Sequence, residues 1–176
     1  METENPKLKT QNFHLVILKK PYLDAIVAGR KTIESRFTRT RHQFLGQVRA
    51  GDKLFLKVSS GPVCAVATVV AVKYFENLTP QQMGDIKRRY NHYIRADEQY
   101  WQSKADCRFG FLAWLENIEP IEPRLISKKD WRAWVVLTAK ENFGLPLPPD
   151  PCRGQALPIS FDFAQDRGGR GKAARP

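Results

Sequence analysis

Cysteine is scarce in this chain and its spacing suits neither a disulfide framework nor a zinc site. The only three cysteines are Cys64, Cys107 and Cys152, which lie far apart with no C-x-x-C pair. Structural zinc sites use closely spaced ligands, and small disulfide-stabilised folds use an even set of thiols. We therefore expect no metal ion and no disulfide. Cys64 lies in an apolar run and is expected to be a buried, unreactive thiol.

Long hydrophobic runs are also missing. No stretch approaches the ~18 consecutive apolar residues that a membrane-spanning helix requires. The segment 1–5 is polar and acidic and lacks the apolar core of a secretory signal. At 176 residues the chain is long enough for one domain with a hydrophobic core. These features predict a cytoplasmic protein with no membrane contact and no cofactor.

Acidic residues are outnumbered by basic ones. The chain has 29 Lys and Arg residues against 18 Asp and Glu residues, a net charge of +11. An excess of this size attracts polyanions and is common in nucleic-acid-binding proteins, although it also simply keeps proteins soluble. The Arg- and Gly-rich C-terminal segment accounts for only part of this net positive charge, because residues 1–150 alone carry +8.

Hydrophobic periodicity predicts a strand, a helix and a strand, followed by mainly antiparallel strands. Pro21 opens the first helix and Gly29 ends it; Thr79, Pro80 and Gln82 form a helix-start signal for a second helix that runs to about Ile94. Residues 96–105 are compatible with a third helix. The predicted strands are 13–18, 31–36, 53–58, 63–72, 109–115 and 131–137.

This order of elements does not match the regular strand–helix alternation of a doubly wound fold. It predicts an α+β protein, a mixed β-barrel with short helices packed at its ends. We expect residues 1–11 to be a disordered N-terminus and residues 12–140 to form the domain. Residues 141–176 are predicted to be a Pro-rich linker and a disordered basic tail, because they have little to bury.

One short motif lies between the first predicted helix and the second predicted strand. It reads G-x-K-x-x-E-x-R, with Gly29, Lys31, Glu34 and Arg36 at its fixed positions, and a Gly51-Asp52 turn follows before a predicted hairpin. From about residue 13 to 137 this arrangement resembles the ASCH family of the PUA-like superfamily. The resemblance implies a PUA-like barrel that binds RNA or a nucleotide in a basic cleft at the motif, with Lys31 facing that cleft.

The physical chemistry of the motif supports part of this interpretation. Gly29 can adopt a positive φ and turn the chain from helix to strand. Glu34 and Arg36 are two residues apart, so in a strand they share one face, where pairing would leave Arg36 donors for a phosphate or a base edge. Lys31 has the opposite parity and must lie on a turn or at a bulge. Without the resemblance, such charges more often form a solvated face with weak ion pairs.

A second feature also favours an anionic ligand. No acidic residue occurs between Glu34 and Asp52, whereas basic residues are frequent there and alternate with Phe37 and Phe44. Single-stranded RNA is bound by such combinations of cations and aromatic rings, although each phenylalanine alone is more typical of a core. Besides the motif, the predicted ligand-contacting residues are Lys19, Lys20, Arg39, Arg41 and Arg49.

Three further features have ordinary structural alternatives. Lys87, Arg88 and Arg95 on the helix after Pro80 form either a binding patch or a solvated helix face. The neighbouring aromatics at 100–101 are either a stacking pair or a lid over the core. The Arg- and Gly-rich segment 167–171 resembles a short RGG element and is either an added nonspecific contact or without function.

The resemblance also raises the question of catalysis. Some ASCH relatives are hydrolases of acylated cytidine or of RNA; in the amidohydrolase pattern the motif lysine works with a threonine three positions later, which is Glu34 here. RNA cleavage with Lys31 or His42 as proton donor and Glu34 as acceptor is chemically feasible. Three hypotheses stay open: a binding module for RNA or a nucleotide, a small hydrolase with Lys31 and Glu34 as acid and base, and a domain that binds other RNA-associated proteins.

Overall fold

Six strands form one curled sheet, in the order β2-β5-β4-β3-β1-β6. The computed structural model describes residues 11–147, and its elements confirm the predicted α+β class. They are β1 (Phe13–Leu18), α1 (Lys20–Val27), β2 (Ile33–Thr38), β3 (Lys53–Val58), β4 (Val63–Phe75), α2 (Pro80–Ile94), α3 (Glu98–Lys104), β5 (Phe109–Arg124) and β6 (Trp134–Leu137).

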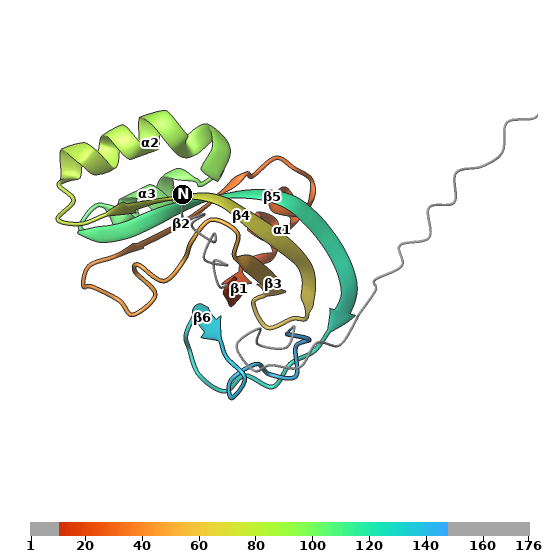
Figure 1. Ribbon diagram of the computed structural model, residues 1–176. Coiled ribbons are helices and arrows are strands. Elements are labelled where there is room, and N and C mark those ends of the chain that lie inside the picture. Colours follow the sequence, from red (N-terminus) through yellow and green to blue (C-terminus); the bar gives the residue numbers. More distant parts are fainter. Residues whose placement is uncertain (1–10, 148–176) are drawn as a thin grey trace, which may run out of the picture.

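The sheet is a mixed half-barrel whose two edges do not pair. β1 runs parallel to β3, and the other neighbouring strands are antiparallel. β4 and β5 arch side by side over β3 and β1 (Figure 1), and three register shifts along their ladder accompany this bend. Within residues 11–147, no strand pairing joins the edge strands β2 and β6. The barrel therefore has an open seam between β2 and the β1–β6 pair.

Four strands have bounds that differ from those predicted: β2, β4, β5 and β6, of which β2 and β4 end later than predicted, at Thr38 and Phe75. β2 starts at Ile33 rather than at Lys31, because the backbone N–H of Lys31 donates to Ala25 at the end of α1. β5 continues far beyond the predicted end at residue 115, since it stays paired with the long strand β4. β6 is shorter than predicted and begins at Trp134; the Asp130 side chain accepts the Arg132 backbone N–H and holds the preceding residues in a turn.

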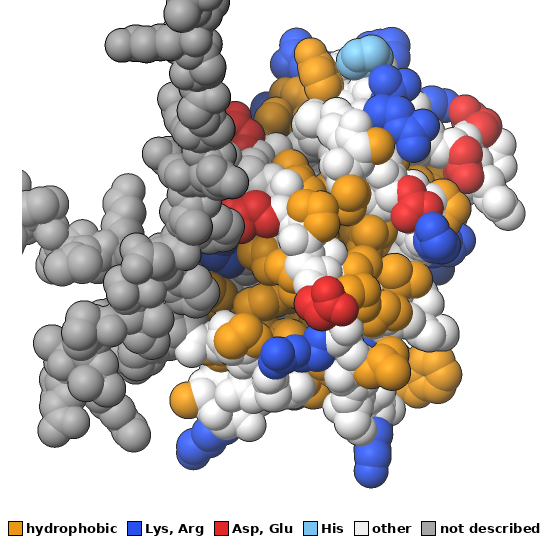
Figure 2. Space-filling view, turned by 90° about the vertical axis from the view of Figure 1, so that its right-hand side faces the viewer, with side chains coloured by type: hydrophobic (Ala, Val, Ile, Leu, Met, Phe, Trp, Pro, Cys, Tyr) orange, Lys and Arg blue, Asp and Glu red, His pale blue; other side chains and the backbone are white. Residues whose placement is uncertain are grey.

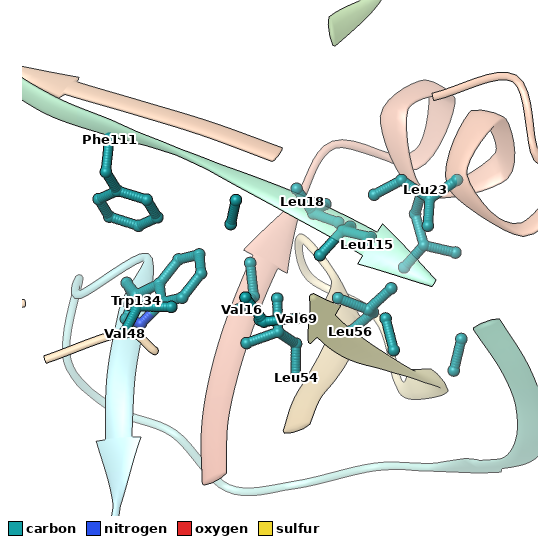
Figure 3. Close-up of a cluster of buried hydrophobic side chains, with 14 of the residues drawn as sticks. Val16, Leu18, Leu23, Val48, Leu54, Leu56, Val69, Phe111, Leu115 and Trp134 are labelled. Atoms are coloured by element: carbon teal, nitrogen blue, oxygen red, sulfur yellow. The ribbon is translucent and has the colours of Figure 1, made fainter. Parts of the chain in front are cut away.

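The main core fills the inside of the curl. Alternating residues of β1, β3, β4 and β5 point inward and are buried, and α1 adds two side chains from the end of the sheet. Figure 3 shows how Phe111 and Trp134 meet at one end of this cluster while Leu23 lies at the other. Phe44, from the loop after β2, is also buried here, so this residue is core rather than an exposed platform. Each such side chain contributes about 1.5–3 kcal/mol on burial.

α2 and α3 cover a second cluster on the outer side of β2 and β5, in which Phe37 contacts Trp101. The predicted start of α2 is confirmed: Thr79 and Gln82 form a reciprocal capping box, with Pro80 in the first turn. Trp101 is buried, so of the two neighbouring aromatics the tryptophan is a core residue. This second layer fixes α3 beside the open seam (Figure 1).

The close approach of β2 to β5 gives a first testable prediction. A Cβ atom on Gly110 would lie 2.5 Å from the Arg36 carbonyl oxygen and collide with the Phe37 ring. Because backbone cannot move aside cheaply, Gly110→Ala is expected to lower the free energy of unfolding by about 1–3 kcal/mol. In urea denaturation, Gly84→Ala is the matched control: its Cβ meets nothing within 4 Å on α2. That variant should gain about 0.5–1 kcal/mol. Equal effects of the two substitutions would contradict the steric argument.

Candidate nucleic-acid interface

A groove follows the open seam beside β2. Its first part is a hollow of about 440 Å³ between the end of β1, the start of α1, β2 and α3. A second hollow of about 270 Å³ continues past β2 to the start of β6. The two parts share four lining residues: Ser35, Arg36, Tyr100 and Lys104.

Arg36 lies at the junction of the two hollows and spans the seam. Its Nη2 atom is 3.0 Å from Glu34 Oε1 and donates at 3.0 Å to the Ile17 carbonyl oxygen on β1. The guanidinium also lies over the Trp134 ring of β6, 5.5 Å from its centroid. Its Nε is buried and is the one buried side-chain polar atom without a partner in the described part of the chain. The predicted Glu34–Arg36 pair is thus confirmed. A single guanidinium nitrogen, Nη2, makes both contacts that orient the Arg36 side chain.

Lys31 lies behind this pair rather than in the groove. Its ammonium donates to the carbonyl oxygens of Ile33 at 2.6 Å and Ile94 at 2.9 Å and is 3.2 Å from Glu34 Oε2. These three acceptors match its three donors. Lys31 and Glu34 are only 3% and 4% exposed, and burial lowers the pKa of Lys31 although Glu34 opposes the shift. The lysine therefore connects the end of α2 to the start of β2.

Several groove residues were missed by sequence reasoning. α3 contributes Tyr100 and Lys104, and α1 contributes Tyr22. The Tyr100 hydroxyl is 2.8 Å from Ser35 Oγ, burial raises its pKa, and Lys104 Nζ lies 5.5 Å from the centre of its ring. The sequence predicted Tyr100 as part of either a stacking pair or a core lid with Trp101, and not as a neighbour of the motif. Nothing local connects α3 with β2, so only the packing of the second core layer brings these groups to the motif.

The other predicted contact residues are dispersed. Lys19 lines the first hollow, whereas Lys20 forms an exposed ion pair with Asp24. Gly29 has the predicted positive φ of 69° and shapes the exit from α1. Arg49 is exposed and lies outside both hollows. Of the nine predicted residues, the groove lining therefore contains Lys19, Glu34 and Arg36.

The loop after β2 lacks acidic residues in sequence but not in space. Arg39 lies 3.6 Å from Asp106, which follows α3, and Arg41 pairs with Glu76, which follows β4. Both pairs are exposed, so they compete only weakly with an anionic ligand. His42, considered as a proton donor, lines the second hollow and stacks on Phe44, with ring centroids 4.3 Å apart. The loop contributes to the groove through His42 rather than through its arginines.

The Gly51-Asp52 turn supports the groove from inside. Buried Asp52 accepts the backbone N–H groups of Asn12 and Arg49 and lies 2.9 Å from His14 Nε2. Trp134 donates from Nε1 to His14 Nδ1 at 3.2 Å. Since an indole can only donate, Nε2 carries the histidine proton and donates it to Asp52. A continuous chain of contacts thus runs from this turn through Trp134 to Arg36.

A separate, larger hollow of about 630 Å³ lies between α2 and the end of β4, lined by Lys73, Arg88, Arg89 and Tyr90 together with Asp85. Residues 11–147 hold 22 Lys and Arg against 13 Asp and Glu residues. Figure 2 shows one face, with basic side chains gathered at its upper edge and hydrophobic ones in its centre. On α2, Lys87 pairs with Glu98 of α3 and Arg88 pairs with Asp85. The α2 patch is therefore partly neutralised by acids on its own element and on α3.

Among residues 11–147, no group of three or more His, Cys, Asp and Glu side chains is placed to hold a metal ion. No helix in that range is long and apolar enough to cross a membrane. Cys64 is half-buried rather than fully buried, and burial raises the pKa of its thiol. The predicted basic tail, including 167–171, lies outside the described residues.

The fold and the groove at its seam define a PUA-like α+β protein. The family model for the ASCH domain matches residues 16–111, and the chain belongs to this family. A crystal structure of ASCH from Zymomonas mobilis aligns with a TM-score of 0.58 at 16% identity, covering 73% of this chain and 90% of that one.

Two mutant forms of the Zymomonas mobilis protein align equally well. A serine-to-alanine mutant gives a TM-score of 0.59 at 16% identity over 76% of this chain and 94% of that chain. A tyrosine-to-phenylalanine mutant gives 0.58 at 16% identity over 73% and 92%. At this identity the likeness establishes a shared fold. No curated protein matches the sequence.

Proposed function

We propose that this ASCH domain binds RNA or a nucleotide in the groove at the open seam of its half-barrel. ASCH domains are PUA-like modules, and that class generally binds RNA. The observation that carries the proposal is Arg36: it lines both hollows, and its contacts with Glu34 and Ile17 are both made through Nη2. A guanidinium oriented in this way keeps its other terminal nitrogen, Nη1, for a phosphate or a base edge without further ordering.

The neighbours of Arg36 fit the same ligand chemistry. Lys19 and Lys104 place two more cations along the first hollow, and Tyr22 and Tyr100 add aromatic surface and hydroxyl groups. Cations contact phosphates, while aromatic rings and hydroxyls contact bases and riboses. Two acids line the first hollow: Glu34 is paired with Lys31 and Arg36, and Asp97 accepts the backbone N–H of Tyr100 at the start of α3. The groove therefore suits an anionic ligand that carries flat rings.

Arg36→Ala is expected to weaken binding of a short single-stranded RNA by roughly 10-fold or more, since hydrogen bonds to charged groups contribute about 1.5–3 kcal/mol. Arg36→Lys should lose much of the same affinity, because an ammonium cannot replace the planar fork. Titrations by fluorescence anisotropy at several salt concentrations would measure this, with affinity falling as salt rises.

The matched variants distinguish binding in the groove from attraction by the overall positive charge. Lys104→Ala removes a groove cation that makes no ion pair in the described structure, and Lys129→Ala removes an exposed cation outside both hollows. Binding that falls for Arg36→Ala and Lys104→Ala but not for Lys129→Ala supports the proposal. Equal losses for all three would indicate nonspecific attraction, and absence of RNA binding would overturn it.

The hydrolase alternative receives less support from the geometry. Lys31 has all three donors occupied and is buried, and Glu34 has an ion-pair partner on each oxygen. Neither reaches a ligand in the groove as a free acid or base. RNA turnover that disappears in Lys31→Ala while the variant stays folded would revive this alternative.

A further inference from the structure

Trp131 is exposed in a way that its neighbours do not explain. Its side chain is 100% exposed, whereas Trp101 and Trp134 are buried and Trp114 is partly buried. Tryptophan is the side chain with the most surface to gain from burial, so full exposure is costly unless a ligand or partner covers it. It lies in the connection between β5 and β6, three residues before β6 begins.

The backbone around Trp131 is fixed on both sides. Asp130 accepts hydrogen bonds from the backbone N–H of Arg132 at 2.9 Å and from its Nε at 3.0 Å, and Lys128 donates to Asp130 as well. Arg132 also pairs with Glu141 beyond β6. These contacts order residues 128–132 while none of them uses the indole. An ordered backbone with an uncovered aromatic ring is preorganised for stacking.

Trp131 also lies on the groove. It lines the second hollow together with Arg36, Lys104 and His42. Its ring and the cations around Arg36 therefore border the same space. Protein sites for single-stranded nucleic acid combine these elements: cations follow the phosphates and an aromatic ring stacks under a base.

We propose that Trp131 is a stacking platform for a nucleobase of single-stranded RNA whose phosphate backbone lies along Arg36 and Lys104. This inference rests on the proposed function and adds to it the second hollow as a base-binding subsite. It makes the ligand a chain rather than one nucleotide, because the first hollow and Trp131 are at the two ends of a continuous groove. The contact is independent of base identity, since every base has a π-face.

The test measures binding of a dye-labelled single-stranded RNA oligonucleotide and of the same oligonucleotide with abasic positions. Trp131→Ala should weaken binding of the intact RNA by about 10-fold, the range of a single stacked base, and Trp131→Phe should retain most of the affinity. Leu125→Ala is the control, since Leu125 is 81% exposed in the same connection but lies outside both hollows. The abasic RNA should bind Trp131→Ala and the unmodified protein equally.

The outcomes separate this inference from the proposed function. If Arg36→Ala weakens binding but Trp131→Ala does not, the stacking platform is wrong and the groove stands. If Trp131→Ala weakens intact and abasic RNA equally, the ring does not stack on a base, and the inference again fails. If the unmodified protein binds no RNA, the proposed function and the inference fall together. Quenching of tryptophan fluorescence by RNA that is lost in Trp131→Phe would give direct support.

Discussion

Replacing Asp52 with alanine will lower the free energy of unfolding by about 3 kcal/mol, because one buried and two part-buried donors lose their acceptor at once and an unsatisfied buried donor costs about 1–3 kcal/mol. The donors are His14 Nε2 and the backbone N–H groups of Asn12 and Arg49. None of them has another acceptor in the described structure. The Gly-Asp turn of the family pattern is thus expected to be a structural requirement of the half-barrel.

Urea denaturation of both proteins measures this effect. Asp106→Ala is the control, since Asp106 is 79% exposed and has a single partner, Arg39, at 3.6 Å. That variant should change stability by less than about 1 kcal/mol. A cost for Asp52→Ala no larger than for Asp106→Ala would contradict the assignment.

The pH dependence of stability checks the same interaction. Burial alone would raise the pKa of Asp52, but the hydrogen bonds from His14, Asn12 and Arg49 outweigh it and hold the pKa below its usual value. The unfolded state therefore binds this proton more readily, so the stabilisation is complete above about pH 4 and is lost as the pH falls through the folded-state pKa. Asp52→Asn should flatten this acid limb of the stability curve. An unchanged acid limb would mean that other carboxylates cause it.

Local sequence signals predicted most of the elements. The capping box at Thr79 and the turn at Gly29 are decided by groups a few residues apart, and both were confirmed. The strands with alternating or continuous apolar residues were also predicted correctly, because that pattern reflects which faces of the sheet are buried. The boundaries at 31–33 and 131–134 were wrong since they depend on distant partners: Thr32 donates to Tyr93, and Ile17 donates to Ala133.

The candidate site was less predictable than the fold. Strand parity placed Glu34 beside Arg36, which follows from a local rule. The acid-free loop suggested arginines without acidic neighbours. In the structure Arg39 and Arg41 instead pair with Asp106 and Glu76, which lie far along the chain. Lys104 and Trp131 carry no local signal of a shared site, and they border the same hollow only because the sheet curls without closing.

The motif residues divide into those that hold the seam and one, Arg36, that we propose as the ligand contact. Gly29 turns the chain, and Lys31, behind the groove, forms a buried pair with Glu34, which lines the first hollow. Arg36 alone extends from this pair across the seam to β1 and Trp134. A buried pair of this kind stabilises one conformation of the arginine.

Lys31→Ala is accordingly expected to lower the free energy of unfolding by about 3–5 kcal/mol, because it leaves Glu34 buried with one partner fewer. It also removes the hydrogen bonds to Ile33 and Ile94 that connect β2 to α2. Any loss of RNA binding should then follow the loss of folded protein. Lys20→Ala, which breaks an exposed pair with Asp24, is the control and should cost less than about 1 kcal/mol.

A double-mutant cycle decides between a structural and a catalytic Lys31. Lys31→Met combined with Glu34→Gln removes both buried charges, so the double variant should be more stable than the sum of the two single variants predicts. Because Glu34 also orients Arg36 through its other oxygen, the double variant should still bind RNA more weakly than the unmodified protein. Additive stabilities would contradict a coupled pair. A stable Lys31→Met variant that binds RNA normally but loses RNA turnover would instead identify Lys31 as a catalytic residue.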